Sequence, residues 1–166
     1  MTKLYRTTHP TPLGPAQIVG DERVLVGLHL TTHRPAPGRQ PEADLIDDAG
    51  PLARVVVQLD EYFAGDRRAF DLDLDLRGSD LQRRIWSALC AVPFAATATY
   101  GGIARAVERP TAARAVGAAC GRNPIWIVVP CHRVVGASGA LTGYAGGLDA
   151  KRHLLDHERE VQAGSR

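Results

Sequence analysis

Tyr100–Cys120 reads YGGIARAVERPTAARAVGAAC, two short helical patterns separated by Arg109-Pro110. Proline has no amide hydrogen and its ring clashes with the preceding turn of a helix. The first helix, Tyr100–Glu108, is therefore expected to end before it, and the second, Thr111–Cys120, to follow. Two short helices around a tight break are typical of a helix-turn-helix. The stretch predicts such a motif at the centre of the C-terminal half.

The second of these helices has almost no bulky side chain. Arg114 is its single long polar residue, in a run of alanine, glycine and valine. Helices that read the major groove of DNA usually project several Asn, Gln, Lys or Arg side chains at base edges. So thin a helix suits the narrower minor groove, with Arg114 entering the space left by an extruded base. Small residues also let two helices pack closely in a core, and the sequence leaves both interpretations open.

A candidate nucleophile follows this helix. After the apolar run Ile125–Val129 comes Pro130-Cys131-His132-Arg133. An unperturbed thiol has a pKa near ~8.5 and reacts as the thiolate, so a base such as His132 would activate Cys131. Adjacent side chains on an extended chain point to opposite sides, so the pair can cooperate only if the chain turns or a water bridges them. A buried structural cysteine beside an incidental histidine is the alternative.

Two further residues could complete a site around this thiol. A last helix is expected from about residue 149 to residue 160, and Glu158 shares its leucine-bearing face. A carboxylate on an apolar face needs a partner, and an imidazole N–H is a suitable one. A frayed last turn is the other possibility. Asn123, just before a proline, could bond the turn that carries the thiol or simply open a turn of its own.

A metal site is a competing interpretation. His153 and His157 lie one helical turn apart, a spacing at which two imidazoles can share a metal ion. No glutamate follows His153 directly and no third ligand has a telling spacing, so we expect solvated histidines and no metal. The chain has three cysteines and no C-x-x-C pair, which favours free thiols in a reducing compartment: Cys90, Cys120 and Cys131.

The N-terminal half reads as a small α+β module. Turn signals separate three short β-like runs: Leu4–Thr7, Ala16–Val19 and Val24–Leu30. Residues 31–50, rich in proline, glycine and acidic residues, read as a loop. A helix with one apolar face is expected over Pro51–Ala64, because proline suits its first position and Gly65 its end. The strict alternation of Phe70–Leu76 predicts a further strand.

The two halves meet at a predicted helix start. Ser79-Asp80-Leu81-Gln82 has the form of a capping box, in which Ser and Gln side chains bond the free amides of a first turn. We therefore expect an α+β protein with one domain over residues 1–78 and another over 79–166. Residues 1–79 hold 9 Lys and Arg against 12 Asp and Glu, and residues 80–166 hold 11 against 6. The second half is better suited to a polyanion, although a solvated basic face has the same signature.

The chain carries no signal for a membrane. Its first ten residues contain no apolar core of signal-peptide length, and the longest apolar stretch, Ile125–Pro130, is far too short to cross a bilayer. The composition, 45% hydrophobic and 23% charged, is ordinary for a globular protein. We expect a soluble, cytoplasmic protein.

With these residues assembled, the chain resembles the O6-alkylguanine-DNA alkyltransferases, or methylated-DNA–protein-cysteine methyltransferases. Pro130-Cys131-His132-Arg133-Val134 matches the family's signature, with an Ile/Val-rich run and Asn123-Pro124 ahead of it. The likeness covers nearly the full chain. Further motifs carry it: Tyr100-Gly101, Ala112–Gly117, Ser138-Gly139, Gly143–Gly147, Lys151, Glu158 and, more weakly, Tyr62–Gly65 and Leu74–Gly78.

The resemblance implies a fold and an activity. The N-terminal domain would support the protein with an RNase H-like sheet, and a C-terminal winged-helix-like domain would bind double-stranded DNA through the minor groove. The alkyl group of an O6-alkylguanine, flipped out of the duplex, would pass to a cysteine once per protein molecule; O4-alkylthymine is a second candidate substrate. The resemblance implies no cofactor and no obligate protein partner.

It also implies a role for each residue of the reaction. Cys131 would accept the alkyl group, and His132 would act as base through a bridging water. Glu158 would orient the imidazole, and Asn123 would brace the turn. Tyr100 would donate a hydrogen bond or a proton to the guanine ring.

The remaining implied residues meet the DNA or the substrate. Arg114 would take the place of the flipped base, and the loop over residues 144–147 would close over the pocket. The DNA-facing surface would include three more positions: Thr99, Ala113 and Gly117. The substrate pocket would include four: Trp126, Val134, Tyr144 and Ala145.

The chain departs from the family pattern at several positions. Ala95-Ala96 follows Pro93-Phe94 where the family often has Gly-Glu, and Gly102 stands where Glu is frequent. Ala145 replaces a serine of some members, and Trp126 is bulkier than usual, which could narrow the alkyl groups accepted. The zinc-binding cysteines and histidines that some members carry near the N-terminus are missing.

Two other functions are weighed against alkyl transfer. A damage-binding module without transfer, like the alkyltransferase-like proteins, would lack the cysteine of the Pro-Cys-His-Arg motif, which is present here as Cys131. A Cys-His-Glu hydrolase would need an oxyanion site, which the glycine-rich residues 136–147 could supply.

Overall fold

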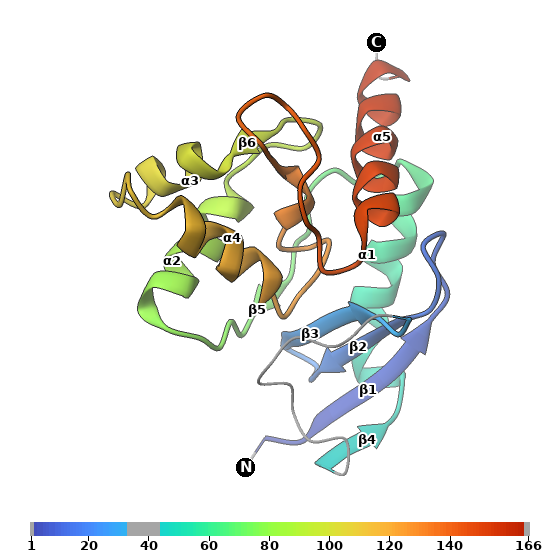
Figure 1. The fold of residues 1–166 in the computed structure, drawn as a ribbon. Coiled ribbons are helices and arrows are strands. Elements are labelled where there is room, and N and C mark those ends of the chain that lie inside the picture. The colour runs from blue at the N-terminus through green and yellow to red at the C-terminus, as the bar shows by residue number, and fades with distance from the viewer. Residues whose placement is uncertain (1, 33–43, 165–166) are drawn as a thin grey trace.

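The chain folds into a small sheet backed by one helix and a group of short helices beside it (Figure 1). These elements are those of a computed structural model, which describes residues 2–32 and 44–164. The predicted α+β class is confirmed. Within the described residues, no helix combines the length and the apolar character that a membrane crossing requires.

The N-terminal half is built on a mixed sheet of five strands: β1 (Leu4–His9), β2 (Ala16–Gly20), β3 (Val24–Leu30), β4 (Leu45–Asp47) and β5 (Asp73–Leu74). Their order is β4-β1-β2-β3-β5. The first three strands pair antiparallel, whereas the two edge strands run parallel to their neighbours. The three β-like runs predicted from the sequence are confirmed.

One edge strand lies where the sequence predicted only a loop. β4 falls within residues 31–50, and its Leu45 pairs with Leu4 of β1. Three residues are too few to show an alternation of buried and exposed side chains, so local sequence carried no sign of this strand. Residues 33–43 of the predicted loop lie outside the described residues.

The predicted strand Phe70–Leu76 is wrong in extent, because only the two residues of β5 pair with the sheet. Near the start of the stretch, the backbone of Asp71 hydrogen-bonds the Gln58 side chain rather than a neighbouring strand. The Asp71 N–H donates to Gln58 Oε1 and the Asp71 carbonyl accepts from Gln58 Nε2, both at 2.9 Å. The alternating apolar residues of this stretch still pack against the core. The alternation of apolar residues therefore reflects one buried face of the segment and not hydrogen-bonded pairing with a neighbouring strand.

One helix lies against the sheet (Figure 1). The chain makes a single 3-10 turn, η2 (Gly50–Leu52), with Pro51 near its start, and continues as α1 (Ala53–Ala64). Gly65 ends α1 in the left-handed conformation, with φ of 84°, as its position predicted. Tyr62 lies on the buried face of α1 and is fully shielded from solvent.

The C-terminal half contains these elements: α2 (Asp80–Cys90), β6 (Ala98–Thr99), α3 (Tyr100–Ala106), α4 (Ala113–Gly121), η3 (Cys131–Arg133), β7 (Val134–Val135) and α5 (Leu148–Gly164). The capping box is confirmed: Ser79 Oγ accepts from Gln82 N at 3.1 Å and Gln82 Oε1 accepts from Ser79 N at 2.9 Å. α3 and α4 pack together as the predicted helix pair. β6 and β7 form a short parallel sheet of two strands.

The two halves are joined along the apolar run that follows α4. Leu28 of β3 donates its N–H to the Pro124 carbonyl and accepts from Trp126 N–H, each at 2.9 Å. Ile125 thereby forms a parallel bridge with Leu28. The run does not continue as a strand, because Ile127 turns the chain with φ of 72°. This turn carries the chain from the sheet toward the Cys131 segment.

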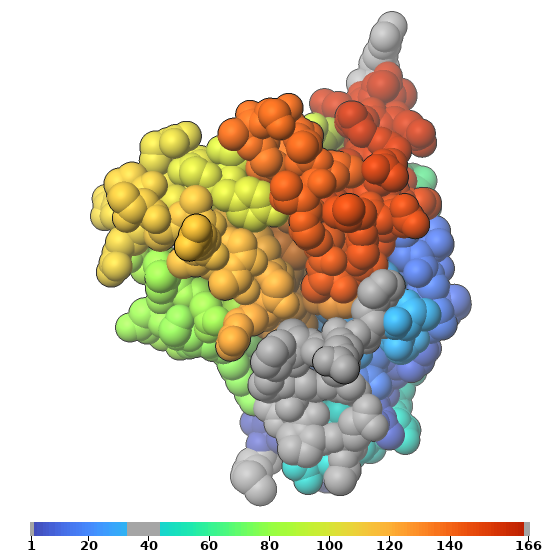
Figure 2. All heavy atoms as spheres, viewed as in Figure 1, coloured from blue at the N-terminus to red at the C-terminus, as the bar shows by residue number. Residues whose placement is uncertain are grey.

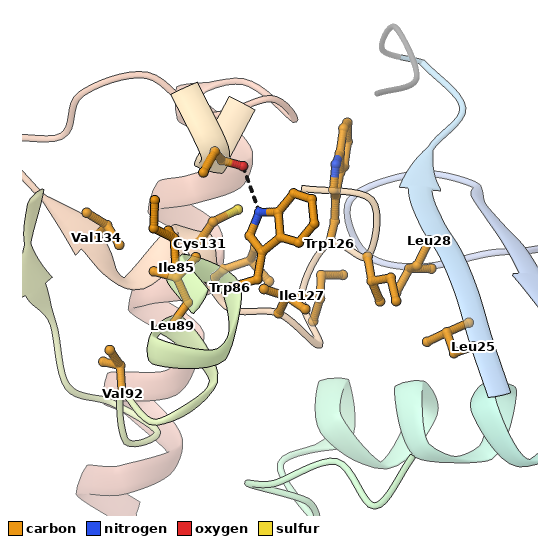
Figure 3. Close-up of a cluster of buried hydrophobic side chains, with 14 of the residues drawn as sticks. Leu25, Leu28, Ile85, Trp86, Leu89, Val92, Trp126, Ile127, Cys131 and Val134 are labelled. Atoms are coloured by element: carbon orange, nitrogen blue, oxygen red, sulfur yellow. Dashed lines mark hydrogen bonds between the residues drawn. The ribbon is translucent and has the colours of Figure 1, made fainter. Parts of the chain in front are cut away.

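A continuous core of buried side chains crosses this junction (Figure 3). It extends from Leu28 through Ile127 to Trp86 of α2, whose indole N–H donates to the Ala119 carbonyl at 2.8 Å. Cys131 belongs to the same cluster and is 2% exposed. The thiol is therefore buried in a core that is continuous across both halves of the chain.

Candidate active site

A tight turn carries the candidate nucleophile. Cys131 N–H donates to the Val129 carbonyl at 2.8 Å, and Arg133 N–H donates to the Pro130 carbonyl at 3.0 Å. Cys131–Arg133 is consequently a single 3-10 turn rather than an extended segment. The chain turns between Cys131 and His132, which meets the condition that sequence reasoning set for their cooperation.

Asn123 bonds this turn at two points. Its Nδ2 donates to the Val129 carbonyl at 2.8 Å and lies 3.1 Å from Cys131 Sγ. Its Oδ1 accepts from Ile125 N–H at 2.9 Å, and the whole residue is buried. Both roles considered for Asn123 are present, because its amide nitrogen bonds the turn that carries the thiol and its amide oxygen opens a turn of its own at Ile125.

Burial sets the starting state of the thiol. It raises the pKa of Cys131 to about 11, although the Asn123 amide and the Lys151 charge act in the opposite direction. At neutral pH the unaided thiol is therefore protonated. Reaction at this sulfur therefore needs a base that takes the proton as the new bond forms.

His132 follows Cys131 in the chain and is paired with Glu158. His132 Nε2 is 2.6 Å from Glu158 Oε2, and neither side chain is reached by solvent. Burial lowers the pKa of His132, while Glu158 opposes that shift. With Nε2–H donating to the carboxylate, Nδ1 keeps a free lone pair, and among the described residues it is the buried side-chain polar atom without a hydrogen-bond partner. A neutral imidazole with a free Nδ1 is poised to accept a proton.

Glu158 is held by more than the histidine. Arg133 Nε donates to Oε1 at 2.8 Å, the Tyr62 hydroxyl donates to Oε2 at 2.7 Å, and Ala95 N–H donates to Oε1 at 3.0 Å. Burial alone would raise the pKa of the Glu158 carboxyl. The hydrogen bonds from His132 and Arg133 and the charge of Arg133 outweigh burial, so the pKa lies well below its ordinary value. The carboxylate stays ionised beside the imidazole.

A cavity of about 500 Å³ opens at the thiol. Its walls come from α3, α4, the Cys131 turn and the loop before α5: Tyr100, Gly117, Cys120, Gly121, Cys131, Thr142, Gly143, Tyr144 and Ala145. The Tyr100 hydroxyl hydrogen-bonds Thr142 Oγ1 at 2.6 Å across the mouth. On the face shown in Figure 2, α4 (yellow to light orange) lies beside this loop (orange). A planar group could reach the sulfur between them.

Two family models match the chain. One, described as "6-O-methylguanine DNA methyltransferase, ribonuclease-like domain", matches residues 4–76, and the other, described as "6-O-methylguanine DNA methyltransferase, DNA binding domain", matches residues 80–160. The chain belongs to the 6-O-methylguanine DNA methyltransferase family. The predicted resemblance is confirmed, together with the ribonuclease-like and DNA-binding character of its two halves.

Relatives of known name and structure span almost the same length. The methylated-DNA–protein-cysteine methyltransferase of Mycobacterium tuberculosis is 48% identical over 155 residues, which cover 93% of this chain and 92% of the relative. The relative of the same name from Methanosarcina barkeri is 42% identical over 155 residues, covering 93% and 97%. The crystal structure of M. tuberculosis OGT in complex with DNA matches with a TM-score of 0.87 at 44% identity, covering 95% of this chain and 94% of that one.

Not every residue expected in the pocket of this methyltransferase lines the cavity. Tyr144 and Ala145 do, but Trp126 and Val134 do not. Trp126 stands behind Tyr144, with ring centroids 6.1 Å apart, and its indole N–H donates to the Asn123 carbonyl at 3.0 Å. Val134 is buried in β7, where it pairs with Ala98. The bulk of Trp126 therefore supports the pocket wall instead of narrowing the space for the alkyl group directly.

α4 has two different faces. Val116 and Ala119 are buried against the core, whereas Arg114 is exposed and Ala113 and Gly117 are half-buried. The close-packing interpretation of the alanine-rich helix is confirmed, because Val116 and Ala119 pack inward on one side. Arg114 lies in solvent on the other side, and its role toward DNA stays a prediction.

A side-chain cap fixes the start of α3 beside α4. Thr99 caps α3, since its Oγ1 accepts from Gly102 N–H at 2.9 Å. A Cβ added at Gly117 would stand 3.8 Å from the Tyr100 ring, an ordinary van der Waals distance. Tyr100 therefore begins α3 facing the Gly117 position of α4.

Four residues around the methyltransferase site were missed as functional by sequence reasoning. Tyr62 and Arg133 each donate a hydrogen bond to Glu158. Lys151 is buried and donates to the Thr142 carbonyl at 3.1 Å. Cys120 is a second thiol in the cavity wall. Lys151 could have been found, because it lies seven residues before Glu158 and so shares its helix face. Nothing local to Tyr62 indicates a partner 96 residues away.

The histidine pair on α5 is used differently. His157 Nε2 lies 2.7 Å from the Tyr62 carbonyl oxygen, while His153 is exposed. Across residues 2–32 and 44–164, no group of three or more His, Cys, Asp or Glu side chains could hold a metal ion.

Proposed function

We propose that this chain repairs DNA by transferring an alkyl group from O6 of guanine to Sγ of Cys131, once per molecule. The observation that carries the proposal is a buried thiol at a cavity, followed in the chain by a buried imidazole whose Nδ1 has no hydrogen-bond partner and whose Nε2 is paired with a carboxylate. Family membership supports O6-alkylguanine as the substrate, and the thiol at the cavity supports Cys131 as the acceptor.

The transfer is an in-line displacement at the alkyl carbon. The S–C bond forms as the C–O6 bond breaks, and both electrons of the broken bond leave with the guanine. Because the raised pKa of Cys131 keeps its proton on at neutral pH, that proton must leave during the step. His132 Nδ1 accepts it through a bridging water, and the ionised Glu158 stabilises the imidazolium that forms.

The leaving guanine carries negative charge until it is protonated. The Tyr100 hydroxyl stands at the cavity, and burial raises the pKa of Tyr144, the second phenol of the wall, so that it stays protonated. Tyr100 donates to the guanine ring, and the loop that contains Tyr144 covers the base. The thioether product has no easy route to hydrolysis, so the protein is consumed.

Access to the base requires that it leave the duplex, since Cys131 is 2% exposed. We infer that α4 lies against the minor groove and that Arg114 fills the space of the extruded base. Ala113, Gly117 and Thr99 would face the DNA with it. O4-alkylthymine is a second candidate for the same pocket.

Two further inferences complete the proposal. Residues 1–78 act as the supporting domain and residues 79–166 as the domain that binds DNA and accepts the alkyl group. The cytoplasm is the compartment in which a bacterial or archaeal relative would meet its DNA, and we infer the same location here.

A matched pair of cysteine variants tests the proposal. A duplex with one labelled O6-methylguanine is incubated with wild-type protein, with Cys131→Ser and with Cys120→Ser, since Cys120 lines the same cavity. We expect one label per molecule in the wild type and in Cys120→Ser, and none in Cys131→Ser. Binding of damaged DNA without any transfer would favour a damage-recognition module, and repeated turnover of an ester would favour a hydrolase.

A further inference from the structure

The N-terminal half of the chain contributes a hydroxyl group to the buried carboxylate of Glu158. Tyr62 of α1 donates to Glu158 Oε2 at 2.7 Å, and His132 Nε2 lies 2.6 Å from the same oxygen. All three side chains have no solvent-exposed surface. One oxygen atom therefore serves the imidazole and the phenol together.

The rest of the carboxylate is fully engaged as well. Oε1 accepts from Arg133 Nε at 2.8 Å and from Ala95 N–H at 3.0 Å, and Oε2 has a longer contact with Arg133 Nη2 at 3.2 Å. Glu158 cannot turn without breaking several of these bonds. Its orientation toward His132 is consequently fixed by groups from α1, the turn before β6 and η3.

The phenol is a permanent donor. Burial, together with the charge of Glu158, raises the pKa of Tyr62 far above its ordinary value, so it does not ionise. Its ring is clamped by aromatic neighbours on both halves of the chain, with centroids 5.1 Å from Phe63, 5.4 Å from Phe70, 6.2 Å from Phe94 and 5.1 Å from His157. The hydroxyl is thus held at a constant place and in a constant protonation state.

Each added donor weakens an oxygen as an acceptor, because the negative charge is shared among more hydrogen bonds. With the phenol in place, Oε2 pulls less strongly on the imidazolium than the same carboxylate would without it. The phenol therefore lowers the hold of the carboxylate on a proton at His132, so the imidazole is neutral and available as a base over a wider range of pH.

We propose that Tyr62 is a positioning residue of the alkyl-transfer reaction, which acts through Glu158 to hold the carboxylate in place and to limit how tightly it retains a proton on His132. The inference rests on the proposed function. It makes the N-terminal half a part of the reacting network and not a scaffold alone.

Other charged groups also face His132. Glu158 and Lys151 approach from α5, Arg133 follows on η3, and the Cys131 thiol precedes it. Beside Tyr62, His157 of α5 contacts the ring. Tyr62 differs from these groups because it can be changed by one hydroxyl without altering the formal charge.

The test follows the pH dependence of the reaction with free O6-benzylguanine, measured as mass gain of the intact protein from about pH 5 to pH 9. In Tyr62→Phe, we expect the acid inflection of the rate to move up by about half a unit to one unit, because the carboxylate now holds the imidazolium more tightly. The plateau rate above it should fall by no more than about threefold. A purely structural role would lower the amount of active protein and leave the inflection where it was.

Two controls keep the outcome decisive. Replacement of Tyr62 with 3-fluorotyrosine strengthens the donor, keeps the packing and should move the inflection to lower pH. Tyr5→Phe removes a phenol of β1 and should leave the profile unchanged. If Tyr62→Phe does not fold, the direction of the fluorotyrosine shift decides.

An unchanged inflection in a folded variant, or equal shifts in Tyr62→Phe and Tyr5→Phe, would overturn the inference. These results differ from failure of the proposed function, in which wild-type protein gains no mass from O6-benzylguanine at any pH.

Discussion

His132 Nε2 and Glu158 Oε2 are 2.6 Å apart in a part of the protein that solvent does not reach. The contact joins the turn after Pro130 to α5. It fixes which nitrogen of the imidazole faces the carboxylate and leaves Nδ1 for the proton of the thiol.

The pH profile of alkyl transfer should show an acid inflection below the ordinary histidine pKa of about 6.5. Burial lowers the pKa of His132, so the neutral imidazole that serves as base persists as the pH falls through that value. Glu158 stays ionised over the same range, because its pKa lies well below its ordinary value. Second-order rates with O6-benzylguanine, measured on protein shown to be folded at each pH, check this. An inflection at or above pH ~6.5 would contradict it.

Glu158→Gln should lower the rate of transfer on the order of 100-fold, because the neutral amide cannot stabilise the imidazolium. It should also cost about 3 kcal/mol of unfolding free energy, since Arg133 loses its buried counter-charge. Asp156→Asn is the matched control, because Asp156 lies on the same helix and pairs only with the exposed Arg159 among the ion pairs of the described residues. Rates for the two variants within threefold of each other would rule out the role given to Glu158.

Ala95→Gly should stabilise the protein by about 1 kcal/mol, because Ala95 has φ of 64°, a conformation that costs an L-residue about that much. The position is one at which the family often has glycine. The N–H of Ala95 would keep its bond to Glu158. Thermal unfolding should show a rise of roughly 2–4 °C in Tm. Ala96→Gly is the control: Ala96 does not have a positive φ, so its replacement should not stabilise. A lower Tm for Ala95→Gly than for the wild type would show that the positive φ of Ala95 does not destabilise the protein.

Arg114→Ala should reduce repair of a methylated duplex far more than reaction with free O6-benzylguanine. The side chain is exposed on α4 and does not line the cavity, so it can affect the DNA without affecting the chemistry. Rates on both substrates are compared with those of Arg54→Ala, an exposed arginine on α1. Equal losses on duplex and free base would argue against a role in base extrusion.

Local signals in the sequence were enough for much of the fold. The capping box at Ser79 and the glycine stop at Gly65 are short-range features, and both form as the sequence predicts. Glu158 could be placed near the imidazole because a charge on a leucine-bearing helix face requires a partner. These inferences work where the cause lies within a few residues of its effect.

Features that depend on distant contacts could not be predicted in this way. β4 forms because it pairs with β1, which lies far away in the sequence. Asp71 is not part of the sheet because its backbone N–H and carbonyl hydrogen-bond the Gln58 side chain. The Tyr62 hydroxyl meets Glu158 only when α1 and α5 come together. The place of Trp126 behind Tyr144 likewise depends on a contact between residues that lie far apart in the chain.

The central claim is that the Cys131 sulfur takes the alkyl group, and intact mass spectrometry with peptide mapping tests it most directly. After incubation with an O6-methylguanine duplex under reducing conditions, the account predicts a gain of about 14 Da, one methylene, on the peptide that contains Cys131, at one event per molecule. The peptide that contains Cys120 should be unmodified. Folded, DNA-bound protein whose Cys131 peptide keeps its original mass would contradict the account.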